Sequence, residues 1–73
     1  MTSVYDELSP TGKALLLGQR VLVKEIDTLG VIYERLPENT HLLYGVRLDE
    51  RVWTVGGFCT DVWHCREEGL EAK

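Results

Sequence analysis

Apolar and polar positions alternate with a period of two through most of the chain after residue 19. The clearest stretch is residues 41–49, in which Leu42, Tyr44, Val46 and Leu48 fall on one face of an extended chain. A similar mixture of β-branched, aromatic and charged residues marks further segments. We therefore predict five short strands, at residues 20–26, 31–36, 41–49, 51–55 and 58–65.

Turn-forming residues separate the predicted strands. Gly30 can adopt a positive φ and is expected to close a turn at residues 27–30. Pro37 fixes φ at about −65°, and Asn39 tolerates the left-handed region, so residues 37–40 also form a turn. Asp49-Glu50 is predicted to be a tight connection between the third and fourth strands.

Residues 1–18 lack this alternation and are predicted to form a helical or turn-like extension. Ser3 and the Ser9-Pro10 pair are helix-start signals, and Gly18 is a stop signal. Residues 14–17 (ALLL) form the longest uninterrupted apolar run. We expect this run to be buried, either at one end of the domain or against a second subunit.

Short strands at this spacing favour a small antiparallel β-barrel or sandwich. The size of the β part fits an SH3-like barrel best, and an OB-fold is second because the chain offers no helix between the third and fourth strands. We predict a mainly β protein in three parts: the extension at residues 1–18, an SH3-like barrel of about five strands at residues 19–66 and a flexible acidic tail at residues 67–73.

The composition limits the chain to one small globular domain. It has 73 residues, 44% hydrophobic and 27% charged, which is too apolar for a disordered segment. Two cysteines cannot make a disulfide-dense scaffold, and the longest apolar run is far shorter than the ~20 residues that span a bilayer. Asp6 and Glu7 do not fit a secretory signal peptide. We therefore expect a cytoplasmic protein.

Half of the net charge of −4 lies at the end of the chain. Residues 20–66 carry six basic and seven acidic side chains, whereas residues 67–73 alone contribute −2. Nucleic-acid backbones are bound by clustered Lys and Arg, and the basic residues here are dispersed. The charge pattern therefore disfavours a nucleic-acid partner.

Cys59, His64 and Cys65 are the candidates for a metal site or a catalytic thiol. The two cysteines are six positions apart, and the adjacent His64 and Cys65 face opposite sides of a strand, which does not match zinc-ligand spacing. No helix N-terminus is placed to lower the pKa of a thiol. We predict buried or half-buried thiols, no metal, no cofactor and no catalytic residues.

The aromatic residues are the more informative candidates. A small barrel cannot enclose all of them, so at least one Trp is expected at a surface or an interface. Three explanations stay open: an aromatic groove for a peptide or ligand, packing against residues 14–17, and homo-oligomerisation. The candidate partner-binding residues are Trp53, Trp63, Tyr33 and Phe58, with Arg47 and Arg51 able to bind an acidic partner.

Four short motifs resemble CAP-Gly domains. Residues 44–50 (YGVRLDE) are similar to that family's W-x-GVELDEP segment, and residues 54–58 (TVGGF) to its S-V-x-G segment. Residues 18–21 (GQRV) and 29–32 (LGVI) stand where the family has G-x-R-V and G-x-V. The resemblance implies an SH3-like barrel. The GKNDG loop that reads C-terminal peptides in that family has no counterpart, so such binding is not implied.

A second, weaker resemblance is to the plasmid-encoded type II dihydrofolate reductases. They are similarly short chains with an SH3-like barrel and a G-x-R-V entry strand, and they act only as tetramers.

Together these features favour a non-enzymatic binding or assembly module that recognises a protein or peptide, including a second copy of itself. The alternatives are a homo-oligomer with a small-ligand or catalytic site at its subunit interface, and a nucleic-acid-associated barrel.

Overall fold

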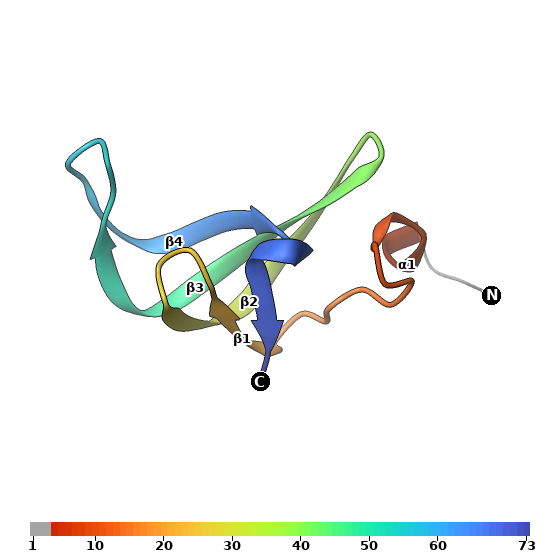
Figure 1. The fold of residues 1–73 in the computed structure, drawn as a ribbon, viewed down its shortest axis with the longest axis horizontal. Coiled ribbons are helices and arrows are strands. Elements are labelled where there is room, and N and C mark those ends of the chain that lie inside the picture. The colour runs from red at the N-terminus through yellow and green to blue at the C-terminus, as the bar shows by residue number, and fades with distance from the viewer. Residues whose placement is uncertain (1–3) are drawn as a thin grey trace.

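The computed structural model describes residues 4–73 and consists mainly of one five-stranded antiparallel sheet (Figure 1). Its elements are α1 (Val4–Leu8), β1 (Arg20–Val23), β2 (Thr28–Glu38), β3 (His41–Trp53), β4 (Cys59–Arg66), the 3-10 helix η1 (Glu67–Gly69) and β5 (Leu70–Ala72). The strands lie in the order β4-β3-β2-β1-β5. The prediction of a mainly β protein is confirmed. No helix within residues 4–73 is long and apolar enough to cross a membrane.

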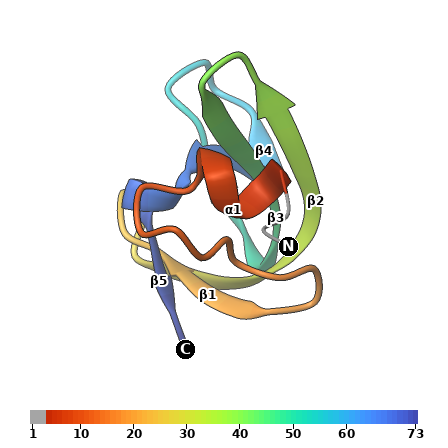
Figure 2. The ribbon, with the colours of Figure 1, turned by 90° about the vertical axis from the view of Figure 1, so that its right-hand side faces the viewer.

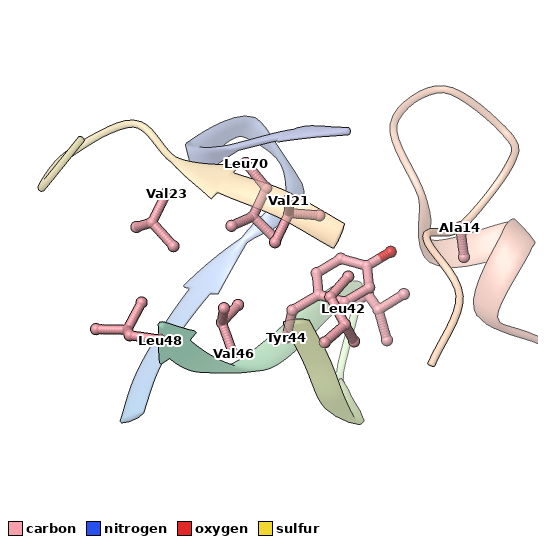
Figure 3. Packing of buried hydrophobic residues seen from close by; sticks show 9 residues of the cluster. Ala14, Val21, Val23, Leu42, Tyr44, Val46, Leu48 and Leu70 are labelled. Atoms are coloured by element: carbon pink, nitrogen blue, oxygen red, sulfur yellow. The ribbon is translucent and has the colours of Figure 1, made fainter. Parts of the chain in front are cut away.

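The core lies against the alternating face of β3. The four residues predicted to share this face are all buried: Leu42, Tyr44, Val46 and Leu48. Figure 3 shows them on the side of β3 that faces Val21 and Val23 of β1 and Leu70 of β5. Because β1 and β3 flank β2 in one sheet, these side chains can meet only where the sheet curls. Within the described residues the edge strands β4 and β5 are not paired with each other, so barrel closure stays a prediction.

The predicted turn at Asp49-Glu50 is wrong, because β3 continues through it to Trp53. The register between β3 and β4 shifts between Arg47 and Val52, so the polar pair is accommodated as an irregularity within the ladder. Arg20 of β1 donates two hydrogen bonds to the Asp49 carboxylate, at 2.9 and 2.8 Å. This bidentate ion pair gives the Asp49 carboxylate an oppositely charged partner within the sheet, so no turn is needed at this position.

The prediction of a flexible acidic tail at residues 67–73 is also wrong, because this segment forms η1 and β5. β5 pairs antiparallel with β1, with Leu70 opposite Val23 and Ala72 opposite Val21. Leu70 is 7% exposed and belongs to the core. One apolar side chain therefore fixes a segment whose acidic composition suggested disorder.

Gly30 lies inside β2, opposite Leu48, and not in the turn predicted for it. A Cβ at Gly30 would approach both the carbonyl oxygen of Arg47 and a methyl group of Val46 to 2.6 Å. The glycine is therefore needed for the close approach of β2 and β3, and Asp27 adopts the positive φ instead. Asn39 has φ of 51°, as its turn position predicted.

The N-terminal extension folds as α1 followed by turns, and we call residues 4–17 the N-terminal arm. The predicted helix start at Ser9-Pro10 is wrong, because α1 ends at Leu8; Ser3 lies outside the described residues. Of the apolar run at residues 14–17, Ala14 is buried in the core. The expected burial fails at Leu16 and Leu17, which are 62% and 55% exposed. Figure 2 shows the arm and α1 beside the curled sheet.

Candidate functional site

The structure separates the six predicted site residues, and Trp63 is the one that packs against the core, where it is partly buried. Trp63 pairs with Val46, whose side chain is fully buried, and its indole packs against the core cluster. Paired residues of a ladder share a face, so Trp63 lies on the inner side of the sheet. Its indole serves the packing of the fold, which leaves Trp53 as the exposed tryptophan that the sequence could not single out.

Trp53 and Phe58 flank the turn at the end of the β3–β4 hairpin. Trp53, paired with Cys59, is the last residue of β3, and residues 54–58 form the turn. We call residues 53–58 the hairpin tip. Its side chains are the most exposed large apolar groups of the described chain: Trp53 at 75%, Phe58 at 71% and Val55 at 112%.

Hydrogen bonds hold the hairpin tip in a defined shape. The Thr54 N–H donates to the Phe58 carbonyl at 2.7 Å, and the Phe58 N–H donates to Thr54 Oγ1 at 3.2 Å. Gly57, with φ of +82°, donates from its N–H to the Thr54 carbonyl at 3.0 Å. The Phe58 ring lies close to Gly56, where a Cβ would stand 3.1 Å from it. The exposed rings are therefore carried by an ordered turn (Figure 1).

Tyr33 and Arg47 belong to a second surface, on the outer face of the sheet. Tyr33 is the extra residue of a β-bulge, because Ile32 pairs with Val46 and Glu34 pairs with Gly45. The ring of Tyr33 lies over Gly45, where a Cβ would stand 3.0 Å from it. The missing side chain of Gly45 therefore provides the seat for this ring.

Charged and polar groups surround the Tyr33 ring. The Arg47 guanidinium lies 5.7 Å from its centroid, within the range of a cation–π contact. The Tyr33 hydroxyl is 3.3 Å from His64 Nε2, and that nitrogen is 3.5 Å from Glu34 Oε1. Arg51, in contrast, is exposed two residues before Trp53 and lies within the irregular stretch of β3 between Arg47 and Val52. The predicted residues thus form two surfaces, one around Tyr33 and one at the hairpin tip.

Sequence reasoning missed a polar cluster beneath the N-terminal arm. The fully buried Tyr44 donates its hydroxyl to Glu67 Oε1 at 3.1 Å and accepts the Leu15 N–H at 3.0 Å. Desolvation raises the pKa of Tyr44 to about 12. The alternation predicted that Tyr44 points inward, but no pattern in the acidic segment marked Glu67 as its partner.

Both thiols are free. Cys59 is exposed, whereas Cys65 is half-buried and its pKa is raised to about 11, first by desolvation and then by the nearby Glu25 and Glu68. A raised pKa leaves less thiolate at neutral pH and opposes a nucleophilic role. As predicted, His64 and Cys65 take opposite faces, since they pair with Gly45 and Tyr44. Within residues 4–73, no three His, Cys, Asp or Glu side chains are grouped to hold a metal ion.

One cavity of about 500 Å³ lies between the arm and the C-terminal elements. It is lined by Pro10, Thr11, Leu15, Lys24, Glu67, Glu68, Leu70 and Ala72. None of the six predicted residues contributes to it, so the aromatic surfaces are separate from this hollow.

Comparisons with known proteins assign the chain to no group: no family model, no curated protein and no solved structure matches it. The resemblance to CAP-Gly domains, on residues 44–50 and 54–58, therefore stays a prediction.

Proposed function

We propose that this protein is a non-enzymatic binding module and that the hairpin tip is its contact surface for a protein partner. The observation that carries the proposal is the exposure of Trp53, Val55 and Phe58 on one projecting turn. Full burial of an apolar side chain stabilises a protein by about 1.5–3 kcal/mol, and these side chains do not gain that free energy while they stand in water. Grouped exposed apolar side chains of this kind are typical of interaction sites.

The chemistry of the tip fits a partner with an apolar pocket and a carboxylate at its rim. Trp is among the residues most often found at the energetic centre of protein interfaces, and rigid aromatic rings lose little conformational entropy on binding. The turn that carries Trp53 and Phe58 is held by its own hydrogen bonds, so little ordering is needed. Arg51, just before the tip, can donate a bidentate pair to a carboxylate.

The other functions considered receive less support. The net charge of −4 opposes a nucleic-acid partner. The raised pKa of Cys65 opposes its activation as a nucleophile. A binding surface on the hairpin tip needs neither.

The test compares Trp53→Ser/Phe58→Ser with the control Leu36→Ser. Leu36 is an exposed apolar residue on β2, outside the hairpin tip. Proteins retained by the immobilised wild-type chain are identified, and the Kd of each purified candidate is measured by calorimetry. Loss of two anchor residues is expected to weaken binding by roughly several hundred-fold, because hot-spot side chains each contribute about 2 kcal/mol and about 1.4 kcal/mol is a factor of ten.

The Leu36→Ser variant should bind like the wild type, and circular dichroism should show that both variants remain folded. If Trp53→Ser/Phe58→Ser binds every purified candidate with unchanged affinity, the hairpin tip is not the contact surface. If no purified candidate binds the wild-type chain at all, the binding-module proposal itself fails.

A further inference from the structure

The N-terminal arm is held on the sheet by side chains that bind its backbone. The Leu15 N–H donates to the Tyr44 hydroxyl at 3.0 Å, and Arg35 Nη1 donates to the Leu15 carbonyl at 3.3 Å. Both backbone groups of one arm residue are thus bound by side chains of β2 and β3. Ala14, 5% exposed, sits beside this contact in the core (Figure 3). The arm is therefore held at Leu15 through its backbone, by side chains that belong to the sheet.

Glu67 binds the preceding part of the arm. Its Oε1 accepts hydrogen bonds from Ser9 Oγ at 2.8 Å and from the Tyr44 hydroxyl at 3.1 Å, and its Oε2 accepts one from Thr11 Oγ1 at 3.1 Å. Farther along, the Arg35 guanidinium lies 4.1 Å from the centroid of the Tyr5 ring. We call Arg35, Tyr44 and Glu67 the arm site, because together they contact the arm from Tyr5 to Leu15.

A single turn joins the docked arm to the sheet. The Gln19 N–H donates to the Leu16 carbonyl at 3.1 Å, the Gln19 side-chain oxygen accepts the Leu16 N–H at 2.9 Å, and Gly18 has φ of +82°. A positive φ at this third position is the signature of a type II turn. From Gly18 onward the chain is tied to Ile32 of β2, at 2.7 and 3.0 Å. Once the contacts at the arm site are broken, opening this turn would therefore let the arm move away without breaking a strand pair.

The turn also exposes apolar surface. Leu16 and Leu17, adjacent in the chain, are 62% and 55% exposed. In the single chain they stand in solvent, although their neighbours Ala14 and Leu15 pack on the core. If the arms of two copies crossed, their linkers would run side by side and the leucines of both copies could bury one another.

We propose that two copies of this chain exchange their N-terminal arms, so that the arm of each copy occupies the arm site of the other. The contacts at Arg35, Tyr44 and Glu67 are the same whichever copy supplies the arm, so only the turn at residues 16–19 changes. Exchange of an identical element in this way is a low-cost route to a symmetric dimer. The hairpin tip takes no part, and the proposal is independent of the function proposed above.

The first test is the mass in solution, measured by light scattering from about 0.01 to 1 mM, since a dimer forms by mass action. The mass should rise from 8.3 kDa towards twice that value. Leu17→Pro should keep the chain monomeric, because Pro favours the second position of a type II turn. Gly18→Val should raise the dimer fraction several-fold at a given concentration, because a β-branched residue resists the positive φ that closes the turn.

The second test shows whether a dimer is built by exchange. Isotope-labelled and unlabelled chains are mixed, and filtered NMR spectra are searched for contacts between Leu15 of one copy and Tyr44 of the other. Such contacts support the proposal. A wild-type chain and a Gly18→Val variant that both stay monomeric throughout, or a dimer without these contacts, would overturn it. Trp53→Ser is the matched control, because it alters the hairpin tip and should leave the dimer fraction unchanged.

Discussion

At the scale of single residues, two positions of the sheet, Gly30 and Gly45, require glycine for different reasons. At Gly45 a Cβ would stand 3.0 Å from the Tyr33 ring, which is 39% exposed, and 3.1 Å from the Cβ of Glu34. At Gly30 it would stand 2.6 Å from the backbone oxygen of Arg47, which cannot move without separating β2 from β3. The same substitution should therefore have unequal costs at the two sites.

We expect Gly30→Ala to lower the free energy of unfolding by about 2–3 kcal/mol and Gly45→Ala by about 1 kcal/mol, in the range of overpacked sites. Urea denaturation measures both. Gly69→Ala is the matched control, since its Cβ would make only ordinary contacts at 3.6 Å with Cys65. Equal losses at Gly30 and Gly45 would contradict the distinction between backbone and side-chain obstacles.

Single residues also mark how far the sequence leads. The alternation at residues 41–49 correctly predicts the buried row of β3, because only one of its faces meets the core. The limited interior of a small barrel indicates that at least one Trp is exposed, but not which one. That choice depends on the pairing of Trp63 with Val46 across strands, which is a property of register and not of local pattern.

At the scale of elements, β5 shows why composition misleads for short segments. Residues 67–73 carry three Glu and only two apolar side chains, so their average favours disorder. Leu70 nevertheless reaches the core, and β5 covers the edge of β1. The turn predicted at Asp49-Glu50 fails for a related reason, because Arg20, distant in sequence, binds Asp49 and makes an extended chain acceptable.

Leu70→Ala tests the contribution of this strand. Truncating a buried leucine leaves a cavity, and we expect the free energy of unfolding to fall by about 2–3 kcal/mol. Val55→Ala provides the control, because Val55 is fully exposed and its loss should cost less than about 0.5 kcal/mol. A Leu70→Ala variant as stable as the control would mean that β5 does not stabilise the fold.

At the scale of the whole molecule, the hairpin tip and the N-terminal arm lie at different ends of the fold. The hairpin tip projects at one end of the sheet, and the N-terminal arm lies near the other (Figure 1). The arm contacts the buried hydroxyl of Tyr44 in β3, and Cys65 is a half-buried thiol opposite Tyr44 in the ladder. Both groups link the stability of the entire domain to pH.

We expect stability to fall as the pH rises from about 9 towards 12. Burial raises the pKa of Cys65 from 9.0 to about 11 and that of Tyr44 from 10.0 to about 12. Between these values the unfolded chain has released protons that the folded chain still holds, so alkaline solution favours unfolding. Urea denaturation at several pH values measures the decline, which should be shallower in Tyr44→Phe. An unchanged decline in Tyr44→Phe/Cys65→Ala would assign it to other groups.

The bulge in β2 separates what the sheet needs from what its outer surface presents. If the codon for Tyr33 were deleted, Glu34 would follow Ile32 directly, and both could keep their present partners, Val46 and Gly45. The reading frame, the strand register and the core would all survive the loss. The aromatic ring on the outer face would disappear, together with its contacts to Arg47 and His64. In evolutionary terms, one inserted codon is enough to give this sheet a new surface at little cost to its fold.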